Sequence, residues 1–103
     1  MSNKLEEARK IINEIDKEMI SLYIKRMQAV RMVAEYKLEN GLPVLDSSRE
    51  SVLKAKNLVE LDDKELEKYY LEFFEGVLES SKDFQKELIE KYNGKKQWKN
   101  MHY

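Results

Sequence analysis

Four polar side chains interrupt the apolar stripes of this 103-residue chain at positions where a hydrophobic residue is expected. Arg26 and Lys37 are eleven positions apart, which places them within about 20° of each other around an α-helix. Ser81 and Gln85 are one helical turn apart on a second apolar stripe. If these stripes face each other, two cations, a hydroxyl and an amide line one interior hollow. Such a hollow is suited to an anion that also accepts hydrogen bonds.

Each of these side chains also has a structural explanation that the sequence leaves open. Arg26 can extend its charged end to solvent or pair with an acidic residue of a neighbouring helix. Gln85 can fix helix register through an interhelical hydrogen bond, and Ser81 can bond the preceding turn of its own helix. Arg9, which flanks the first stripe, is equally explained by a solvated helix face. The binding-site hypothesis therefore depends on the set and not on any one member.

A single long helix is expected over most of the first 40 residues. Neither glycine nor proline interrupts this segment, and its apolar residues recur at steps of three and four. At 1.5 Å per residue such a helix extends about 50 Å, which exceeds the width of a compact domain of this size. We therefore expect a second copy of the chain to cover much of the stripe. The stripe consists of Leu5, Ala8, Ile12, Ile15, Met19, Leu22, Ala29, Val33 and Tyr36.

The stretch from Gly41 to Glu50 is predicted to end this helix and to start another. Asn40-Gly41 is typical of a helix C-terminus, Pro43 disfavours continuation, and Ser47-x-x-Glu50 matches a capping box. The second helix should begin near Asp46 or Ser47 and end near Leu61. Its expected inward residues are Val52, Leu53, Ala55 and Leu58.

A third helix is predicted from the capping pattern Asp62-x-x-Glu65 to about Tyr92, where Asn93-Gly94 would stop it. The fold class is therefore all-α, with one domain over residues 1–93 and a C-terminal tail over residues 94–103 that we expect to be flexible. The inward residues expected for the third helix are Leu66, Tyr70, Phe73, Val77, Ser81, Phe84 and Leu88.

Composition excludes several classes of function. Lys and Arg total 19 and Asp and Glu total 20, so there is no basic field of the kind that binds nucleic acid. The chain has no cysteine and one histidine, His102, so neither a thiolate nucleophile nor a metal site is expected, and no cofactor is implied. No apolar run approaches the roughly 20 residues of a membrane span, and the first residues lack a signal region. We expect a cytoplasmic protein.

The ordered polar residues resemble the all-helical class of chorismate mutases. The resemblance covers about Leu5 to Tyr92, and its specificity lies in the ordered set with the intervening lengths of helix. Leu45 is apolar where bacterial relatives often have arginine, which concerns charge at the rim of the site. The matching positions are Arg9, Asp16, Arg26, Lys37, Pro43, Val44, Asp46, Arg49, Glu50, Ser81 and Gln85.

The resemblance implies an intertwined homodimer with two equivalent sites that convert chorismate to prephenate, in the shikimate pathway to phenylalanine and tyrosine. Each site would take Arg9 from one chain and the remaining residues from the other. Arg26 and Arg9 would bind carboxylates, and Lys37 and Gln85 would donate to the ether oxygen. Around the ring, Glu50 would accept from the hydroxyl with help from the Asp46 backbone, while Arg49 and Ser81 would complete the shell.

Two alternatives stay open at this point. An isochorismate-pyruvate lyase has the same fold and shares the cations of the first helix, although Asp46-x-x-Arg49-Glu50 favours the mutase. A non-catalytic helical dimerisation or regulatory module needs only the apolar stripes, so the polar residues would be unexplained in it.

Overall fold

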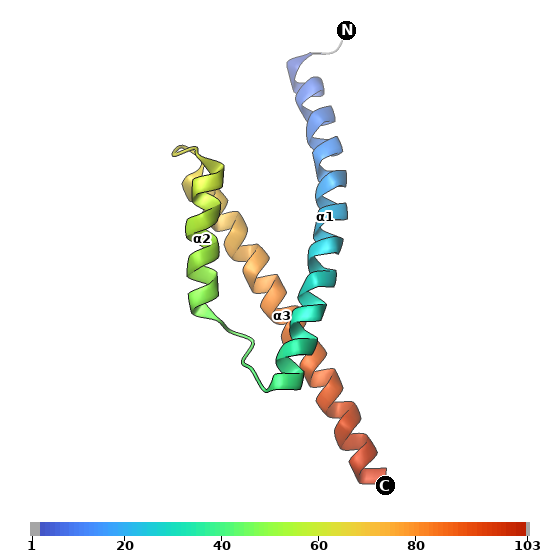
Figure 1. The fold of residues 1–103 in the computed structure, drawn as a ribbon. Helices are drawn as coiled ribbons and strands as arrows, with labels where there is room; N and C mark the ends of the chain where they lie inside the picture. Colours follow the sequence, from blue (N-terminus) through green and yellow to red (C-terminus); the bar gives the residue numbers. More distant parts are fainter. Residues whose placement is uncertain (1–2, 103) are drawn as a thin grey trace.

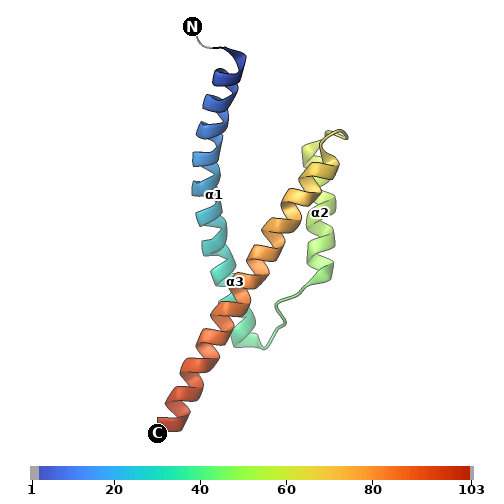
Figure 2. The ribbon, with the colours of Figure 1, turned by 180° about the vertical axis from the view of Figure 1, so that it is seen from behind.

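The computed structural model describes the backbone of residues 3–102 and the side chains of residues 3–93. Within this range the chain forms three helices, α1 (Lys4–Asn40), α2 (Ser47–Leu61) and α3 (Glu67–His102). Helix α3 crosses the C-terminal part of α1, and α2 lies along the first half of α3 (Figure 1). The opposite view shows the same crossing, with the N-terminal part of α1 diverging from α3 (Figure 2). The predicted all-α fold is confirmed.

Local hydrogen bonds define the long first helix at both ends. The side chain of Asn3 accepts from the backbone N–H of Glu6 at 2.8 Å, which satisfies a donor of the first turn. Gly41 ends the helix in the left-handed conformation, with φ of 63°, and its N–H donates to Leu38 O at 3.4 Å. A single helix up to Asn40 was predicted, and the structure confirms it.

The start of α2 corrects one predicted cap. Asp46, and not Ser47, is the N-cap, because its Oδ1 accepts from the backbone N–H of Arg49 at 3.0 Å. The capping-box assignment of Glu50 is therefore wrong, and its carboxylate is directed to another helix. An aspartate one residue earlier offers the same acceptor as the serine, so sequence spacing alone did not separate the two.

Both predicted ends of the third helix are wrong. Asp62 is the C-cap of α2, and Asp63 accepts from the N–H groups of Glu65 and Leu66 in the turn before α3. At the other end α3 continues through Asn93-Gly94 to His102. A glycine within a helix costs about 1 kcal/mol relative to alanine, which is not enough to end a helix when no proline follows. The predicted domain boundary at residue 93 and the flexibility of residues 94–103 stay predictions, since the side chains there lie outside the described residues.

The core of the single chain is small. Among residues 3–93 the buried hydrophobic side chains are Val30 and Ala34 on α1 and Phe74 and Leu78 on α3. The predicted stripe of α1 instead remains exposed, including Met19 at 43% and Val33 at 44%. Periodicity identifies an apolar stripe but not the surface that covers it, and α3 packs on a neighbouring face.

Several other residues predicted to face inward do not do so in this chain. On α2, Leu53 and Leu58 are half-buried, but Val52 and Ala55 are exposed. Leu66, in the turn before α3, and Phe73 on α3 are exposed, at 47% and 53%. The buried apolar residues of α3 are Phe74 and Leu78, each one position after the predicted Phe73 and Val77, whereas Ser81 is buried as predicted.

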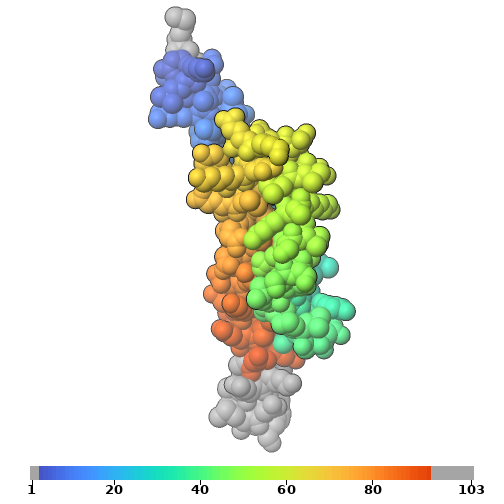
Figure 3. Space-filling view, turned by 90° about the vertical axis from the view of Figure 1, so that its left-hand side faces the viewer, coloured from blue at the N-terminus to red at the C-terminus, as the bar shows by residue number. Residues whose placement is uncertain are grey.

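Helix α2 is attached to α3 largely through polar contacts. Asn57 donates to the Tyr70 hydroxyl at 2.9 Å, and Lys54 pairs with Glu75 at 2.6 Å. In the space-filling view α2 lies against the first half of α3 along most of its length (Figure 3). The chain is elongated, with extents of 70 × 33 × 16 Å.

Candidate functional site

Two of the predicted site residues meet where α1 and α3 cross. The guanidinium of Arg26 donates from Nη1 to the hydroxyl of Ser81, and that hydroxyl donates to Val77 O at 2.8 Å. Ser81 therefore both bonds its own preceding turn and holds a cation of another helix. The prediction that Ser81 bonds the preceding turn of its own helix is confirmed, and the same hydroxyl can also accept from Arg26 because a hydroxyl can donate and accept at once.

Neither predicted cation of α1 is neutralised inside the chain. Among the side chains of residues 3–93, Arg26 and Lys37 form no ion pair with a carboxylate. Both are half-buried, in agreement with their predicted position on one face. A half-buried cation without a counter-charge favours an anionic ligand. Among residues 3–93 no acidic side chain pairs with Arg26, so the structure gives no support to the alternative in which Arg26 pairs with an acid of a neighbouring helix.

Gln85 is buried on α3, one turn after Ser81, and each of these residues is only 6% exposed. Its Oε1 atom is buried and has no hydrogen-bond partner among the described residues. Buried amide groups in proteins are nearly always hydrogen-bonded, so an interhelical bond within this chain does not explain Gln85. The buried, unsatisfied amide oxygen of Gln85, one turn after the serine that binds Arg26, is a sign of a binding site among the described residues.

Lys37 fixes the connection between α1 and α2. Its ammonium donates to Val44 O at 2.7 Å, which ties residues 42–46 to the end of α1. An ammonium has three N–H donors, so this bond leaves Lys37 capacity for a ligand. The bond thus holds the connection against the end of α1 just before α2 begins.

Glu50 and its neighbours at the start of α2 lie in different environments. Glu50 is half-buried and pairs with Lys82 of α3 at 3.0 Å between Nζ and Oε1. Arg49 is exposed, and the side chain of Asp46 serves as a helix cap. Within one chain, therefore, Glu50 is directed to α3, while the structure does not bring Arg49 to the other polar residues.

Arg9 lies far from the other predicted site residues of its own chain. It is exposed on α1, and the 17 positions between Arg9 and Arg26 correspond to about 25 Å along the helix. No side chain bridges that length, so Arg9 cannot join Arg26 in a site made by one chain.

Lys82 is a residue of this region that the sequence pattern did not reveal. It contacts Glu79 at 2.9 Å and Glu50 at 3.0 Å. The contacts with Glu79 and then with Glu50 raise the pKa of the Lys82 ammonium, and Lys82 lowers the pKa of the Glu79 carboxyl. Lys82 is therefore charged at neutral pH. The available signal was weak, since a lysine three residues after a glutamate is ordinary on a helix surface.

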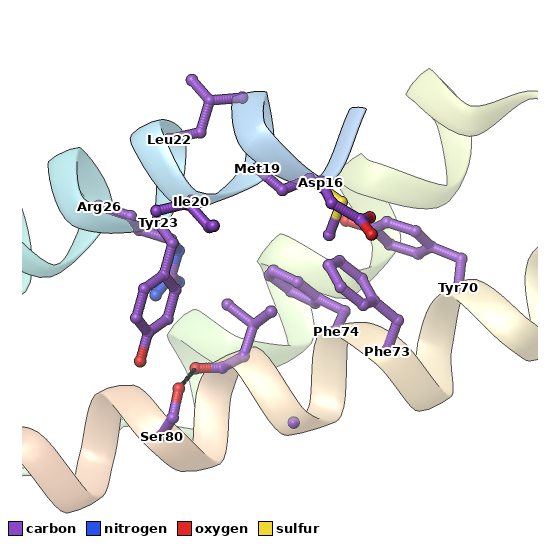
Figure 4. A pocket seen from close by; sticks show the side chains of 12 residues that line it. Asp16, Met19, Ile20, Leu22, Tyr23, Arg26, Tyr70, Phe73, Phe74 and Ser80 are labelled. Carbon is purple, nitrogen blue, oxygen red and sulfur yellow. Dashed lines mark hydrogen bonds between the residues drawn. The ribbon is translucent and has the colours of Figure 1, made fainter. Parts of the chain in front are cut away.

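A hollow of about 700 Å³ between the diverging parts of α1 and α3 contains only one predicted site residue, Arg26. Figure 4 shows Tyr23 and Arg26 reaching from α1 toward α3, with the rings of Phe73 and Phe74 directed back toward α1. Its wall is mainly apolar and open to solvent. This hollow is better suited to cover by another protein surface than to binding of an anion.

Comparisons with known proteins agree with this geometry. Residues 8–86 match the family model of chorismate mutase type II. The chain is 42% identical over 95 residues to the bifunctional chorismate mutase/prephenate dehydratase of Buchnera aphidicola subsp. Baizongia pistaciae, a match that covers 90% of this chain and 25% of that protein. It is 31% identical over 97 residues to the chorismate mutase of Methanocaldococcus jannaschii, covering 92% of this chain and 97% of that one. No solved structure matches significantly.

The family match spans the crossing of α1 and α3 and the start of α2, which hold the polar residues described above. The matches confirm the predicted resemblance and support the predicted chorismate mutase function. The chain belongs to the type II family of chorismate mutases.

Proposed function

We propose that this chain catalyses the conversion of chorismate to prephenate. The observation that carries the proposal is the group at the helix crossing: Arg26 and Lys37 have no carboxylate partner among residues 3–93, and the buried Gln85 has an unsatisfied amide oxygen. Chorismate has two carboxylates, a hydroxyl and an ether oxygen. Its two carboxylates complement the two cations, and its ether oxygen can accept from the amide N–H2 group of Gln85.

The reaction is an intramolecular Claisen rearrangement, in which a C–O bond breaks as a C–C bond forms within one molecule. It needs no nucleophile and no proton transfer, so the protein contributes restraint of the reacting geometry and charge stabilisation. Arg26 binds a carboxylate through its planar fork, and Ser81 holds that fork in place. Lys37 and Gln85 donate to the ether oxygen as negative charge develops there.

Residues at the start of α2 bind the ring. Glu50 accepts from the ring hydroxyl, with the Asp46 backbone nearby. Arg49, exposed in the single chain, completes the shell around the ring carboxylate together with Ser81. These roles follow from the family resemblance and from the attachment of Glu50 to α3.

The proposal includes a homodimer in which Arg9 of one chain completes the site of the other. The radius of gyration is 18.9 Å, whereas a compact monomer of this length has about 13 Å. Ile20 and Leu22 are each 62% exposed on the wall of the apolar hollow, which a second α1 would cover. The small core and the distance of Arg9 from its own site support the same arrangement.

The proposed function also includes a cellular location and a metabolic pathway. Among the described residues no helix is long and apolar enough to cross a membrane. The chain spans about a quarter of the length of the bifunctional Buchnera relative, whose name also includes prephenate dehydratase. We propose a cytoplasmic step of phenylalanine and tyrosine biosynthesis, with prephenate as the product.

The decisive experiment follows the loss of chorismate absorbance and the formation of prephenate at micromolar protein. Arg26→Ala should abolish most turnover, whereas Arg31→Ala is the matched control. Arg31 belongs to the same helix but stacks on the Phe84 ring at 5.1 Å, outside the site. Turnover of isochorismate to pyruvate and salicylate, without prephenate formation from chorismate, would instead identify the lyase. Lack of both activities would leave a non-catalytic helical module.

A further inference from the structure

Lys82 links the start of α2 to the part of α3 that contains Ser81 and Gln85. Its Nζ lies 3.0 Å from Oε1 of Glu50, and both side chains are largely buried, at 18% and 16% exposed. The other ion pair between these helices, Lys54 with Glu75, is 34% and 48% exposed. The Lys82–Glu50 pair is thus the better shielded of the two, and water screens it less.

The contact is mainly one between charges. Glu50 Oε1 is buried and has no aligned hydrogen bond among the described residues, so the ammonium is its main compensation. A shielded carboxylate without a counter-charge is strongly unfavourable and would move toward solvent. Glu50 therefore depends on Lys82 for its position.

Lys82 is close in sequence to two of the predicted site residues. Ser81, the preceding residue, accepts from Arg26, and Gln85 lies three residues later on the same helix. The contact with Lys82 therefore holds the Glu50 side chain within one helical turn of Ser81 and Gln85. Because Lys82 contacts Oε1, the other carboxylate oxygen of Glu50 is left for a substrate hydroxyl.

We propose that Lys82 is a positioning residue that holds the Glu50 carboxylate directed toward α3, so that Glu50 accepts the ring hydroxyl of the substrate. Lys82 also neutralises Glu50, which otherwise would repel a substrate with two carboxylates. The inference rests on the proposed function and adds a residue that acts only through Glu50. Glu79, the second partner of Lys82, is 56% exposed and has no part in the site.

The absence of cysteine from the chain allows a site-specific chemical test. Lys82→Cys removes the ammonium, and alkylation of the new thiol with 2-bromoethylamine restores an ammonium at nearly the original distance. We expect Lys82→Cys to lower kcat/KM for chorismate about ten-fold or more, mainly through KM, and alkylation to restore most of it. Lys82→Arg should retain activity to within about three-fold, because it keeps the charge.

Lys54→Cys is the matched control, since it removes the more exposed ion pair between the same two helices. It should leave kcat/KM nearly unchanged before and after alkylation. Thermal unfolding of both variants separates a loss of stability from a loss of positioning. If Lys82→Cys unfolds, Lys82→Arg and Glu79→Gln still test the inference, as both must remain active.

A double-mutant cycle with Glu50→Gln tests whether Lys82 acts through Glu50. Once the carboxylate is gone, replacing Lys82 should change kcat/KM by less than about three-fold. A full additional loss would show direct contact with substrate and overturn the inference, as would normal KM in Lys82→Cys. Absence of chorismate turnover by the unaltered protein would instead reject the proposed function itself, and the inference with it.

Discussion

Arg26 and Ser81 are separated by 55 positions in the sequence, and in the fold the guanidinium of one donates to the hydroxyl of the other. The bond fixes the direction of the Arg26 fork at the crossing of α1 and α3. A planar fork binds a carboxylate through two N–H groups, which an ammonium cannot reproduce.

Arg26→Lys should therefore weaken binding and slow turnover together, although the charge is kept. We expect kcat/KM to fall about ten-fold or more. The measurement is initial-rate kinetics on chorismate, with Arg31→Lys as a control on the same helix. An Arg26→Lys enzyme with unchanged kcat and KM would show that the fork does not bind substrate.

Lys37→Ala should act mainly on turnover. The ammonium donates to an oxygen that becomes negative only as the reaction proceeds, so its loss should lower kcat by about 10² or more. The matched control is Lys25→Ala, an exposed lysine of the same helix. Near-normal kcat in Lys37→Ala would contradict this role. Circular dichroism should accompany the kinetics, because Lys37 also holds Val44 O.

Gln85→Glu should make the enzyme prefer acid. An amide donates at any physiological pH, whereas a glutamate donates only when protonated, and its ionised form opposes the charge developing on the ether oxygen. The activity of the variant should therefore rise as pH falls through the pKa of the new carboxyl, while the parent remains comparatively flat. Profiles of kcat/KM between about pH 4.5 and 8.5 test this. Profiles of identical shape would remove Gln85 from the breaking bond.

Sedimentation should find a dimer at low micromolar concentration, with unfolding that depends on protein concentration. Ile20→Asp places a charge on the apolar hollow and should dissociate the dimer. Val59→Asp is the control, because Val59 is 78% exposed on α2 and does not line the hollow. A stable, compact monomer of the parent protein would refute the proposed assembly.

Mixing two inactive variants tests whether Arg9 crosses between chains. An Arg9→Ala chain supplies Arg26, and an Arg26→Ala chain supplies Arg9, so each heterodimer should contain one intact site and one that lacks both. Refolded mixtures should regain activity in proportion to the heterodimer fraction. Proven heterodimers without activity would mean that each site is built within one chain.

Features that depend on near neighbours in the chain were largely predictable. The long first helix, its end at Asn40-Gly41 and the second helix from Ser47 to Leu61 follow from apolar period, turn residues and caps. The errors of local structure are also local, since adjacent acceptors compete for the same N–H groups. That is how Asp46 replaced Ser47 as a cap.

The inward position of Ser81 and Gln85 was predicted as well, because a polar residue within an apolar stripe is visible in the sequence. The surface that covers the apolar stripe of α1 was not predicted. Val30 and Ala34 are the buried residues of this helix, and Val33 is exposed. A period identifies a face, but the covering surface belongs to another segment or another chain.

The sequence by itself determined the helices, the fold class and the set of polar residues that breaks the apolar pattern, since hydrogen bonds and periodicity over a few residues carry that information. Tertiary structure decided which of those residues meet. The Arg26–Ser81 bond and the Lys82–Glu50 pair join residues of different helices, and their formation depends on the crossing of α1 and α3 and on the docking of α2. Charge pairing over such separations leaves no periodic trace in a chain, so Lys82 resembles any surface lysine until the helices are packed.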